Sequence, residues 1–393
     1  MRHREMDYAG CVRRFALLLL FACSRPTPLP AERASSAGDA ASVVTMTDAN
    51  APADVPIAVS RDAGADATAE LDPKAPLDAI DLHVDLAWQA HAGHLNLADG
   101  ARQAGRAQLR EGQVGSILAS LFVEKAYAMT PAEARREYEA TFADATRLFA
   151  RDGAGVLGAP LGAAAAGTVR VRVSFEGADG FADDPDAAVA WVKRGACVFA
   201  LVHSRSNALG GASQETDPAR RARGLTAAGR TLAKRLLDAG AILDVSHASD
   251  ATAADLAQLA EARKVPFVAT HSGMRALHDI PRNVDDALIK RIATSGGVVG
   301  VSFYVGHLVR GAQASLDDVV AHLEHLRDVG STRVVALGSD FEGGIVPPKD
   351  AKTIAALPVL AERLRARGWP EGDVRAFFHD NAARVLGRCP SPQ

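Results

Sequence analysis

Short apolar runs alternate with segments of helical periodicity along the chain from about residue 78 onward. A short apolar run bounded by turn residues is typical of a buried strand, whereas a longer segment with apolar residues every three or four positions is typical of a helix. Strands that alternate with helices pair in parallel within one sheet. Eight runs are predicted to be strands: 79–85, 114–123, 169–175, 197–203, 241–246, 265–270, 297–303 and 333–339.

Start signals mark several of the helices between these strands. Thr130, Thr226 and Ser249 each stand at the position expected for an N-cap residue. A last helix, over about 371–386, is expected to pack outside the ring of strands. Eight parallel strands with intervening helices indicate an α/β fold of the (β/α)8 TIM-barrel type. An open doubly wound sheet is the alternative, but no Gly-rich phosphate-binding loop follows the first strand.

Polar residues gather at the carboxyl ends of the predicted strands. In a (β/α)8 barrel the catalytic residues lie at these ends, so they share one mouth of the barrel. Six of the eight strands carry a His, Asp or Glu there. These residues are His83 and Asp85, Glu176, His203, His247, His271 and Asp340.

The types of these residues predict a metal site. His83 and Asp85 are two apart on one strand and therefore point to the same face, while His247 and His271 each close an apolar run. Imidazole and carboxylate groups are ligands of zinc. We expect His83 and Asp85 to bind one zinc ion, His247 and His271 to bind a second, and Glu176 to bridge the two. A hydroxide held between the ions would be the nucleophile.

The remaining polar residues near the mouth suit the other steps of amide hydrolysis. Such a reaction needs stabilisation of an oxyanion and delivery of a proton to the leaving amine. His203 is expected to donate to the oxyanion, and Asp340 to hold the substrate's amino group or relay a proton. Arg282, in the loop after the sixth strand, is expected to pair with a substrate carboxylate. Glu176, His203 and Asp340 are thus the predicted catalytic residues.

The N-terminal segment indicates export. Arg13 and Arg14 precede a short apolar run that stops at Cys23, a pattern typical of a signal peptide and similar to a bacterial lipobox. Residues 1–23 are therefore predicted to be a lipoprotein signal, and the exported protein to be attached to the bacterial membrane only through lipid on Cys23. Residues 24–77 lack aromatic residues and any apolar period, which predicts a disordered linker before a catalytic domain at 78–388.

Composition narrows the classes of function. The chain has 393 residues with 48% hydrophobic content, enough for one large core. Its formal net charge of −3 comes from intermixed acids and bases, so no nucleic acid partner is expected. Only two of the four cysteines, Cys197 and Cys389, lie beyond the signal. They argue against a Cys-based zinc site or nucleophile, and the sequence leaves open whether they pair.

Several motifs in this chain resemble those of one known family and occur in the same order as in that family. They are Asp81-Leu82-His83-Val84-Asp85-Leu86, Ser174-Phe175-Glu176-Gly177, Leu225-Thr226-Ala227-Ala228-Gly229, Asp244-Val245-Ser246-His247, Thr270-His271-Ser272 with Arg282-Asn283 and Asp286, and Leu337-Gly338-Ser339-Asp340-Phe341. The chain resembles the membrane dipeptidases, the renal dipeptidase-like branch of the amidohydrolase superfamily. This resemblance covers nearly the whole predicted catalytic domain.

The resemblance implies the same barrel, two zinc ions and the same ligand set as the strand ends predict. It assigns His203 and Arg282 to the substrate, and Asp340 to proton transfer or amine binding. Family members hydrolyse dipeptides, often with a D-residue at the C-terminal position, and many are homodimers. This chain departs from the family at Glu342, where Asp is common, and we expect Glu342 beside the pocket.

Seven histidines have no matching role in the family. They are interpreted mostly as surface or loop residues, with the first two near the pocket rim: His91, His94, His278, His307, His322, His325 and His379.

Two other functions remain as alternatives to a zinc dipeptidase. One is a related amidohydrolase acting on another amide, lactam or lactone. Such enzymes usually carry His-x-His on the first strand and often a carboxylated Lys on the fourth, and neither is present here. The other is a lipoprotein that binds a ligand without catalysis, which would be expected to have lost a metal ligand or Asp340.

Overall fold

The computed structural model describes residues 72, 74–93, 102–152 and 168–393. The predicted signal at 1–23 and most of the predicted linker at 24–77 lie outside the described residues. The predicted domain at 78–388 falls within them, apart from the two gaps.

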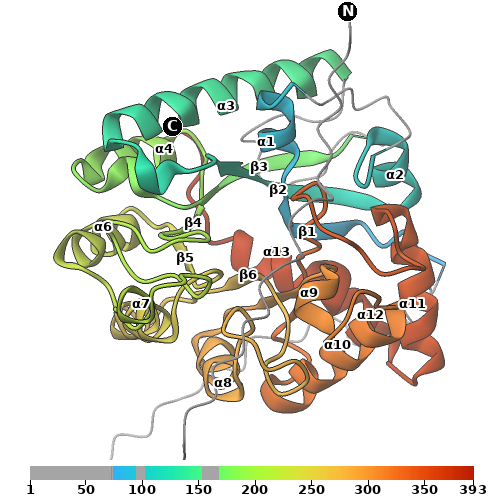
Figure 1. The fold of residues 1–393 in the computed structure, drawn as a ribbon. Helices are drawn as coiled ribbons and strands as arrows, with labels where there is room; N and C mark the ends of the chain where they lie inside the picture. The colour runs from blue at the N-terminus through green and yellow to red at the C-terminus, as the bar shows by residue number, and fades with distance from the viewer. Residues whose placement is uncertain (1–71, 73, 94–101, 153–167) are drawn as a thin grey trace, which may run out of the picture. The chain divides into compact units, whose positions relative to one another are not determined.

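Eight parallel strands form the barrel, as predicted (Figure 1). They are hydrogen-bonded in the order β5-β4-β3-β2-β1-β8-β7-β6, and a parallel bridge between Asp244 and Val268 joins the β5 and β6 ends of this order. The strands are β1 Ala79–Val84, β2 Val114–Phe122, β3 Arg170–Glu176, β4 Val198–Ala200, β5 Ile242–Asp244, β6 Ala269–Ser272, β7 Val299–Val301 and β8 Val335–Leu337.

Helices follow the strands and begin where the sequence signals them. Thr130 and Glu133 form a reciprocal capping pair at the start of α3. The side chain of Thr226 accepts from the amide of Gly229, and that of Ser249 accepts from Thr252. The α-helices are α1 Leu86–His91, α2 Arg106–Glu111, α3 Pro131–Asp152, α4 Pro185–Lys193, α5 Pro218–Arg221, α6 Ala227–Asp238, α7 Asp250–Ala262, α8 Asp286–Ser295, α9 Val305–Leu308, α10 Leu316–Gly330, α11 Leu357–Ala366, α12 Glu371–Arg375 and α13 Asn381–Leu386. Short 3-10 turns lie at Ala126–Ala128, Asp179–Phe181 and Ile354–Ala356.

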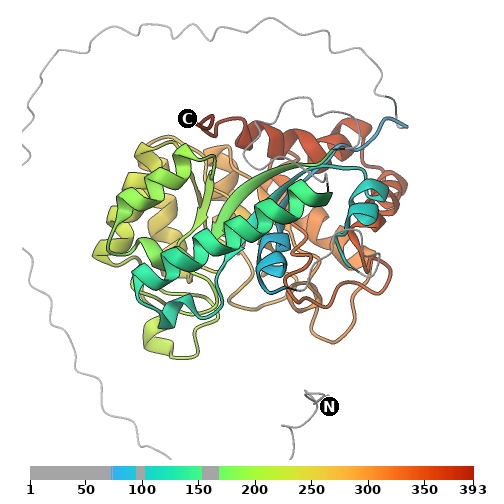
Figure 2. The ribbon, with the colours of Figure 1, turned by 90° about the horizontal axis from the view of Figure 1, so that it is seen from above.

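The C-terminal helical segment covers the amino end of the barrel (Figure 2). It is broken into α12, a π-helical segment Ala376–Asp380 and α13. Ala382, Val385 and Leu386 of α13 form one apolar cluster with interior strand residues such as Leu82 and Ile242. The prediction that this helix packs outside the ring is therefore wrong for α13. Its apolar residues at helical spacing close an interior that would otherwise be open to water.

A disulfide bond joins this C-terminal helical segment to the barrel. Cys197, directly before β4, is bonded to Cys389, which follows α13, and their Cα atoms are 5.6 Å apart. The bond joins residues 192 positions apart in the sequence. It therefore restricts the unfolded chain strongly.

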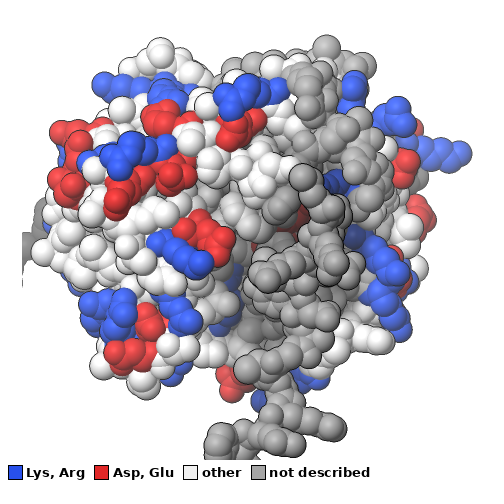
Figure 3. Space-filling model, turned by 45° about the horizontal axis from the view of Figure 1, so that its top comes forward, with Lys and Arg blue, Asp and Glu red and all other residues white. Residues whose placement is uncertain are grey.

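Charged side chains of both signs are interspersed on the outer face shown in Figure 3. Arg194 pairs with Glu139 of α3 at 2.6 Å, and Arg235 of α6 pairs with Asp186 of α4. Such exposed pairs contribute little to stability individually. Among the described helices, none combines the length and apolar character that a transmembrane span requires.

The disulfide gives a prediction about stability. Replacing Cys197 and Cys389 together by Ser should lower the free energy of unfolding by about 2–5 kcal/mol, because the unfolded chain regains the entropy that the closed loop removes. Urea unfolding of the oxidised wild type, the reduced wild type and the double variant measures this. The reduced wild type should unfold near the variant, and a variant as stable as the oxidised wild type would contradict the prediction.

Candidate functional site

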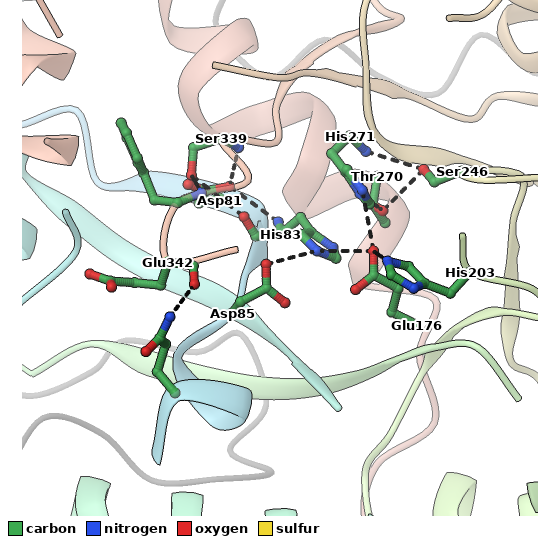
Figure 4. Close-up of polar contacts among 12 residues, drawn as sticks. Asp81, His83, Asp85, Glu176, His203, Ser246, Thr270, His271, Ser339 and Glu342 are labelled. Carbon is green, nitrogen blue, oxygen red and sulfur yellow. Dashed lines mark hydrogen bonds and ion pairs between the residues drawn. The ribbon is translucent and has the colours of Figure 1, made fainter. Parts of the chain in front are cut away.

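The predicted metal ligands lie together with His203 and Asp340 at the carboxyl-end mouth of the barrel. Figure 4 shows His83, Asp85, Glu176, His203 and His271 of this group. Glu176 is the last residue of β3, and His271 lies within β6. His203, His247 and Asp340 each lie three residues beyond the end of their strand, β4, β5 and β8 respectively. Strands β4, β5 and β8 are shorter than predicted, because in each case the chain turns before it reaches the functional residue.

Glu176 is at the centre of the site. Its Oε1 atom faces the Nε2 atoms of four histidines, at 2.8 Å from His247, 3.4 Å from His271, 3.5 Å from His83 and 3.8 Å from His203. These four histidines come from four different strand ends. One carboxylate oxygen therefore organises side chains that are far apart in the sequence.

Asp85 and Asp340 complete the set of possible metal ligands. Asp85 Oδ2 lies 3.5 Å from His83 Nε2. Three groups of side chains hold their ligand atoms within 4.8 Å of one another: His83 with Glu176 and His271, Glu176 with His203 and His247, and His83 with Asp85 and Asp340. The five predicted metal ligands are thus all present in one cluster, and His203 and Asp340 lie within reach of it.

Two of these residues have a left-handed backbone conformation at the mouth of the barrel. His247 has φ 64° and Asp340 has φ 68°, values that non-glycine residues rarely adopt. Each such residue costs on the order of 1–3 kcal/mol and persists only when its surroundings fix it. The amide of Ser213 donates to the carbonyl of His247 at 2.8 Å, and the amide of Asp340 donates to the carbonyl of His83 at 3.1 Å. The strain is therefore held at the site by neighbouring backbone.

A buried relay orients His271. The hydroxyl of Thr270 donates to Asp244 Oδ2 at 2.5 Å. Because its proton is used in that bond, Thr270 Oγ1 accepts from Nδ1 of His271 at 3.0 Å. With its proton on Nδ1, His271 presents an unprotonated Nε2 to Glu176. Asp244 and Thr270 are positioning residues that sequence reasoning missed, although both lie in the quoted motifs.

Gln214 orients the ring of His247 in a similar way. Its Oε1 lies 3.1 Å from His247 Nδ1, while His247 Nε2 faces the carboxylate of Glu176. A metal-binding histidine usually donates its second ring N–H to such an oxygen. Gln214 belongs to the loop after β4, and no motif in the sequence pointed to it.

The charges of the site suit the binding of a cation. Burial lowers the pKa of His247 and of His271 well below the ordinary value, which leaves both rings neutral and able to bind a cation. Burial also lowers the pKa of His83, but the carboxylates of Glu176 and Asp85 outweigh it and raise that pKa to about 10. Burial raises the pKa of Glu176 and, more strongly, that of Asp340. Both carboxylates are thus buried where their charged forms are disfavoured, and a bound cation would stabilise those forms.

Unpartnered polar atoms test whether these residues fit a metal. Nε2 of His83 and Oδ1 of Asp85 are buried without a hydrogen-bond partner within the described part of the chain. Buried polar atoms in native proteins nearly always have a partner. A cation bound between imidazole nitrogens and carboxylate oxygens would satisfy both atoms, and this donor set suits zinc. The residues therefore fit a metal.

A cavity of about 240 Å³ opens over the cluster. Trp88 and Phe122 form apolar parts of its wall, with Asp340 and His203 among the polar parts. The His203 side chain is 28% exposed, whereas those of the other three histidines around Glu176 are 8% exposed or less. His203 is thus the histidine most accessible to a substrate, as its predicted role requires. Burial lowers its pKa, so the ring is neutral near pH 7.

Arg282 lies beside the cluster. It is buried, its Nε and Nη2 atoms have no hydrogen-bond partner among the described residues, and its charge acts on Asp340 and Glu176. A buried guanidinium with free donors is suited to a carboxylate ligand. The geometry is that expected of a substrate-binding arginine.

Glu342 lies beside the pocket, as expected, because its neighbour Gly343 lines the cavity and the charge of Asp85 acts on it. Its side chain is not part of the cavity wall, and its Oε1 accepts from the amide of Ala104 at 2.7 Å.

The expectation that the remaining histidines are mostly surface or loop residues is wrong for His307 and His322, which are buried within α9 and α10. His278 is a loop residue, as expected, but it is buried.

Known proteins are similar to this chain in sequence and in fold. Residues 71–390 match the family described as membrane dipeptidase, Peptidase family M19. Dipeptidase 3 of Rattus norvegicus is 30% identical over 163 residues, which make up 42% of this chain and 33% of the rat protein. The chain thus matches about a third of the length of that relative.

Solved structures extend the similarity over the whole barrel. The dipeptidase AC, a metallopeptidase of family M19, is similar with a TM-score of 0.69 and 25% identity, over 79% of this chain and 98% of that one. A metallopeptidase from Rhodobacter sphaeroides, liganded with a phosphinate mimic of the dipeptide L-Ala-D-Ala, has the same fold with a TM-score of 0.67 and 24% identity, over 79% and 99% of the two chains. Because the family match spans most of its length, this chain belongs to the membrane dipeptidase family, Peptidase family M19.

Proposed function

We propose that this protein is a zinc-dependent dipeptidase that hydrolyses the peptide bond of dipeptides, including those with a C-terminal D-residue. The observation that carries the proposal is the position of Glu176, whose Oε1 lies within 3.8 Å of four imidazole nitrogens. Membership of the family supports the substrate class, and the family resemblance supports the tolerance for a D-residue.

Two zinc ions would share the cluster. His83 and Asp85 would hold one ion, His247 and His271 the other, and Glu176 would bridge them, as the convergence of these side chains on Glu176 allows. When bound, such a pair would supply a bridging hydroxide as the nucleophile and polarise the scissile carbonyl. Asp244 and Thr270 would keep His271 Nε2 free to bind.

The chain's own residues would bind and orient the dipeptide. Arg282 would pair with its C-terminal carboxylate, and His203, the most accessible of the four imidazoles, would donate to the developing oxyanion. Asp340 lines the cavity and would hold the amino group or deliver a proton to the leaving amine. The apolar wall of Trp88 and Phe122 would limit the access of water to the bond.

The alternatives differ from this proposal in their substrates. A related amidohydrolase would act on another amide, lactam or lactone, and a non-catalytic lipoprotein would act on none. Turnover of a panel of L,L and L,D dipeptides by the zinc-loaded protein separates the three functions. The family match and the complete set of polar residues favour the dipeptidase.

We also propose that the protein is exported and tethered by lipid on Cys23, and that it forms a homodimer. The basic and apolar N-terminal pattern supports the first part, and the family resemblance supports the second. That the chain binds no nucleic acid stays a prediction.

The metal count is directly measurable. Purified protein should contain close to two zinc ions per chain, and a chelator should remove both the metal and the turnover of a simple dipeptide, with zinc restoring them. Elemental analysis by mass spectrometry gives the ratio of zinc to protein. A single ion in a fully active sample would rule out the bridged pair.

Two substitutions test the assigned roles. Glu176→Gln and Asp340→Asn should each lower kcat/KM for a dipeptide by at least about 100-fold, because the first removes the bridging charge and the second a proton-transferring carboxyl group. Circular dichroism should show an unchanged fold. Asp186→Asn is the matched control, because this carboxylate is 72% exposed on α4 and should leave activity unchanged. Wild-type activity in either site variant would refute the role of that residue.

The lipid anchor is tested separately. Cys23→Ser should move the protein from the membrane fraction to the soluble fraction of cells that produce it, because lipid is attached to that thiol. Immunoblotting of the two fractions measures the shift. Unchanged attachment to the membrane would contradict the anchor.

A further inference from the structure

A second chamber adjoins the cavity over the metal cluster. It has a volume of about 490 Å³, within the roughly 300–1,000 Å³ that ligand pockets occupy. Gln214, Tyr304 and His307 line both spaces, so the two are neighbours across these side chains. The walls of the chamber come mainly from the loop after β4 and the loop after β6, with Arg282 among them.

Several residues that line this chamber have buried polar atoms without partners. Ser213 is 3% exposed and its Oγ has no hydrogen-bond partner among the described residues. Three further atoms are also buried without a hydrogen-bond partner among the described residues: Nε and Nη2 of Arg282 and Nδ1 of His307. Burying such groups costs free energy unless a ligand or water accepts from them. The two Arg282 atoms require an acceptor, and Ser213 Oγ and His307 Nδ1 are able to donate as well, which suits an anionic ligand.

The charge of the chamber is positive. Arg221 lines it, is partly buried, and donates from Nη1 to the carbonyl of Glu215 at 3.3 Å. Within the described ranges, no carboxylate forms an ion pair with Arg221. The carboxylate of Glu215 also lines the chamber, but it is occupied by the loop, accepting from the amides of Ser206, Thr216 and Asp217. Arg221 and Arg282 therefore both line the chamber, while the carboxylate of Glu215 is already hydrogen-bonded to backbone amides.

The two arginines are placed for two carboxylates of one ligand. Arg282 lies close enough to Glu176 and Asp340 for their charges to act on it, so it is next to the reacting bond and suits the C-terminal carboxylate. Arg221 lies in the second chamber, where the side chain of the C-terminal residue would extend. An arginine fork pairs well with a carboxylate there.

We propose that this chamber selects dipeptides whose C-terminal residue carries an acidic side chain, with Arg221 as the residue that recognises it. The inference rests on the proposed dipeptidase function and names its preferred substrates. Ser213 and His307 contribute neutral hydrogen bonds on the same wall. Acidic dipeptides should therefore be better substrates than neutral dipeptides of the same shape.

Paired substrates test the selectivity. Ala-Glu and Ala-Gln differ only in the side-chain carboxylate, and Ala-Ala establishes which configuration of the C-terminal residue is hydrolysed faster. In that configuration, kcat/KM of the zinc-loaded full-length protein should be about tenfold or more higher for Ala-Glu than for Ala-Gln. The ratio should fall with rising ionic strength, because salt screens the pairing.

Variants of the loop identify the arginine responsible. Arg221→Gln should reduce the ratio to about one, and Arg221→Lys should retain part of it, because the charge remains. The ratio compares two substrates on one protein, so it does not depend on a variant's overall activity. Arg223→Gln is the matched control, since Arg223 lies in the same loop but is exposed and does not line the chamber. It should retain the wild-type ratio.

The outcomes separate this inference from the proposed function. If Ala-Ala is hydrolysed but Ala-Glu and Ala-Gln react equally well, or if Arg221→Gln keeps the wild-type ratio, the acidic preference is overturned and the dipeptidase function stands. If none of the dipeptides is hydrolysed, the proposed function fails and the inference fails with it.

Discussion

The structure depends on one buried carboxylate surrounded by imidazoles. Burial disfavours the charged form of Glu176, and the neighbouring carboxylates Asp85 and Asp340 add to the unfavourable charge. His247 and His271, kept neutral by burial, offer lone pairs rather than positive charge. A cation among its members would stabilise such a cluster. The ends of parallel strands allow this convergence because they bring distant residues to one mouth.

The surroundings of the cluster fix its geometry at a cost in backbone strain. His247 and Asp340 adopt left-handed conformations that neighbouring amides hold in place. Gln214 accepts a hydrogen bond from Nδ1 of His247, and Thr270, which donates to Asp244, accepts from Nδ1 of His271, so these contacts set the tautomers of two histidines. At the other end of the barrel, α13 and its disulfide close the interior. Contacts at both ends of the strands thus support the barrel that positions the site.

The sequence predicted the parts of this arrangement that follow a regular rule. All eight strands and the residues at their ends were predictable, because apolar runs define strands and the barrel dictates where their ends meet. The roles of Gln214 and Arg221 were not, because they depend on the path of the loop after β4, which has no periodic pattern. The packing of α13 across the barrel and the pairing of Cys197 with Cys389 depend on tertiary contacts that local patterns do not encode.

The central claim is that Glu176 bridges two zinc ions at the barrel mouth. Anomalous X-ray diffraction from crystals of the zinc-loaded protein, recorded on both sides of the zinc absorption edge, tests it directly. The account predicts two anomalous peaks, each about 2.0–2.2 Å from an oxygen of the Glu176 carboxylate, one beside His83 and Asp85 and the other beside His247 and His271. Peaks located elsewhere, or a Glu176 carboxylate that contacts neither ion, would contradict it.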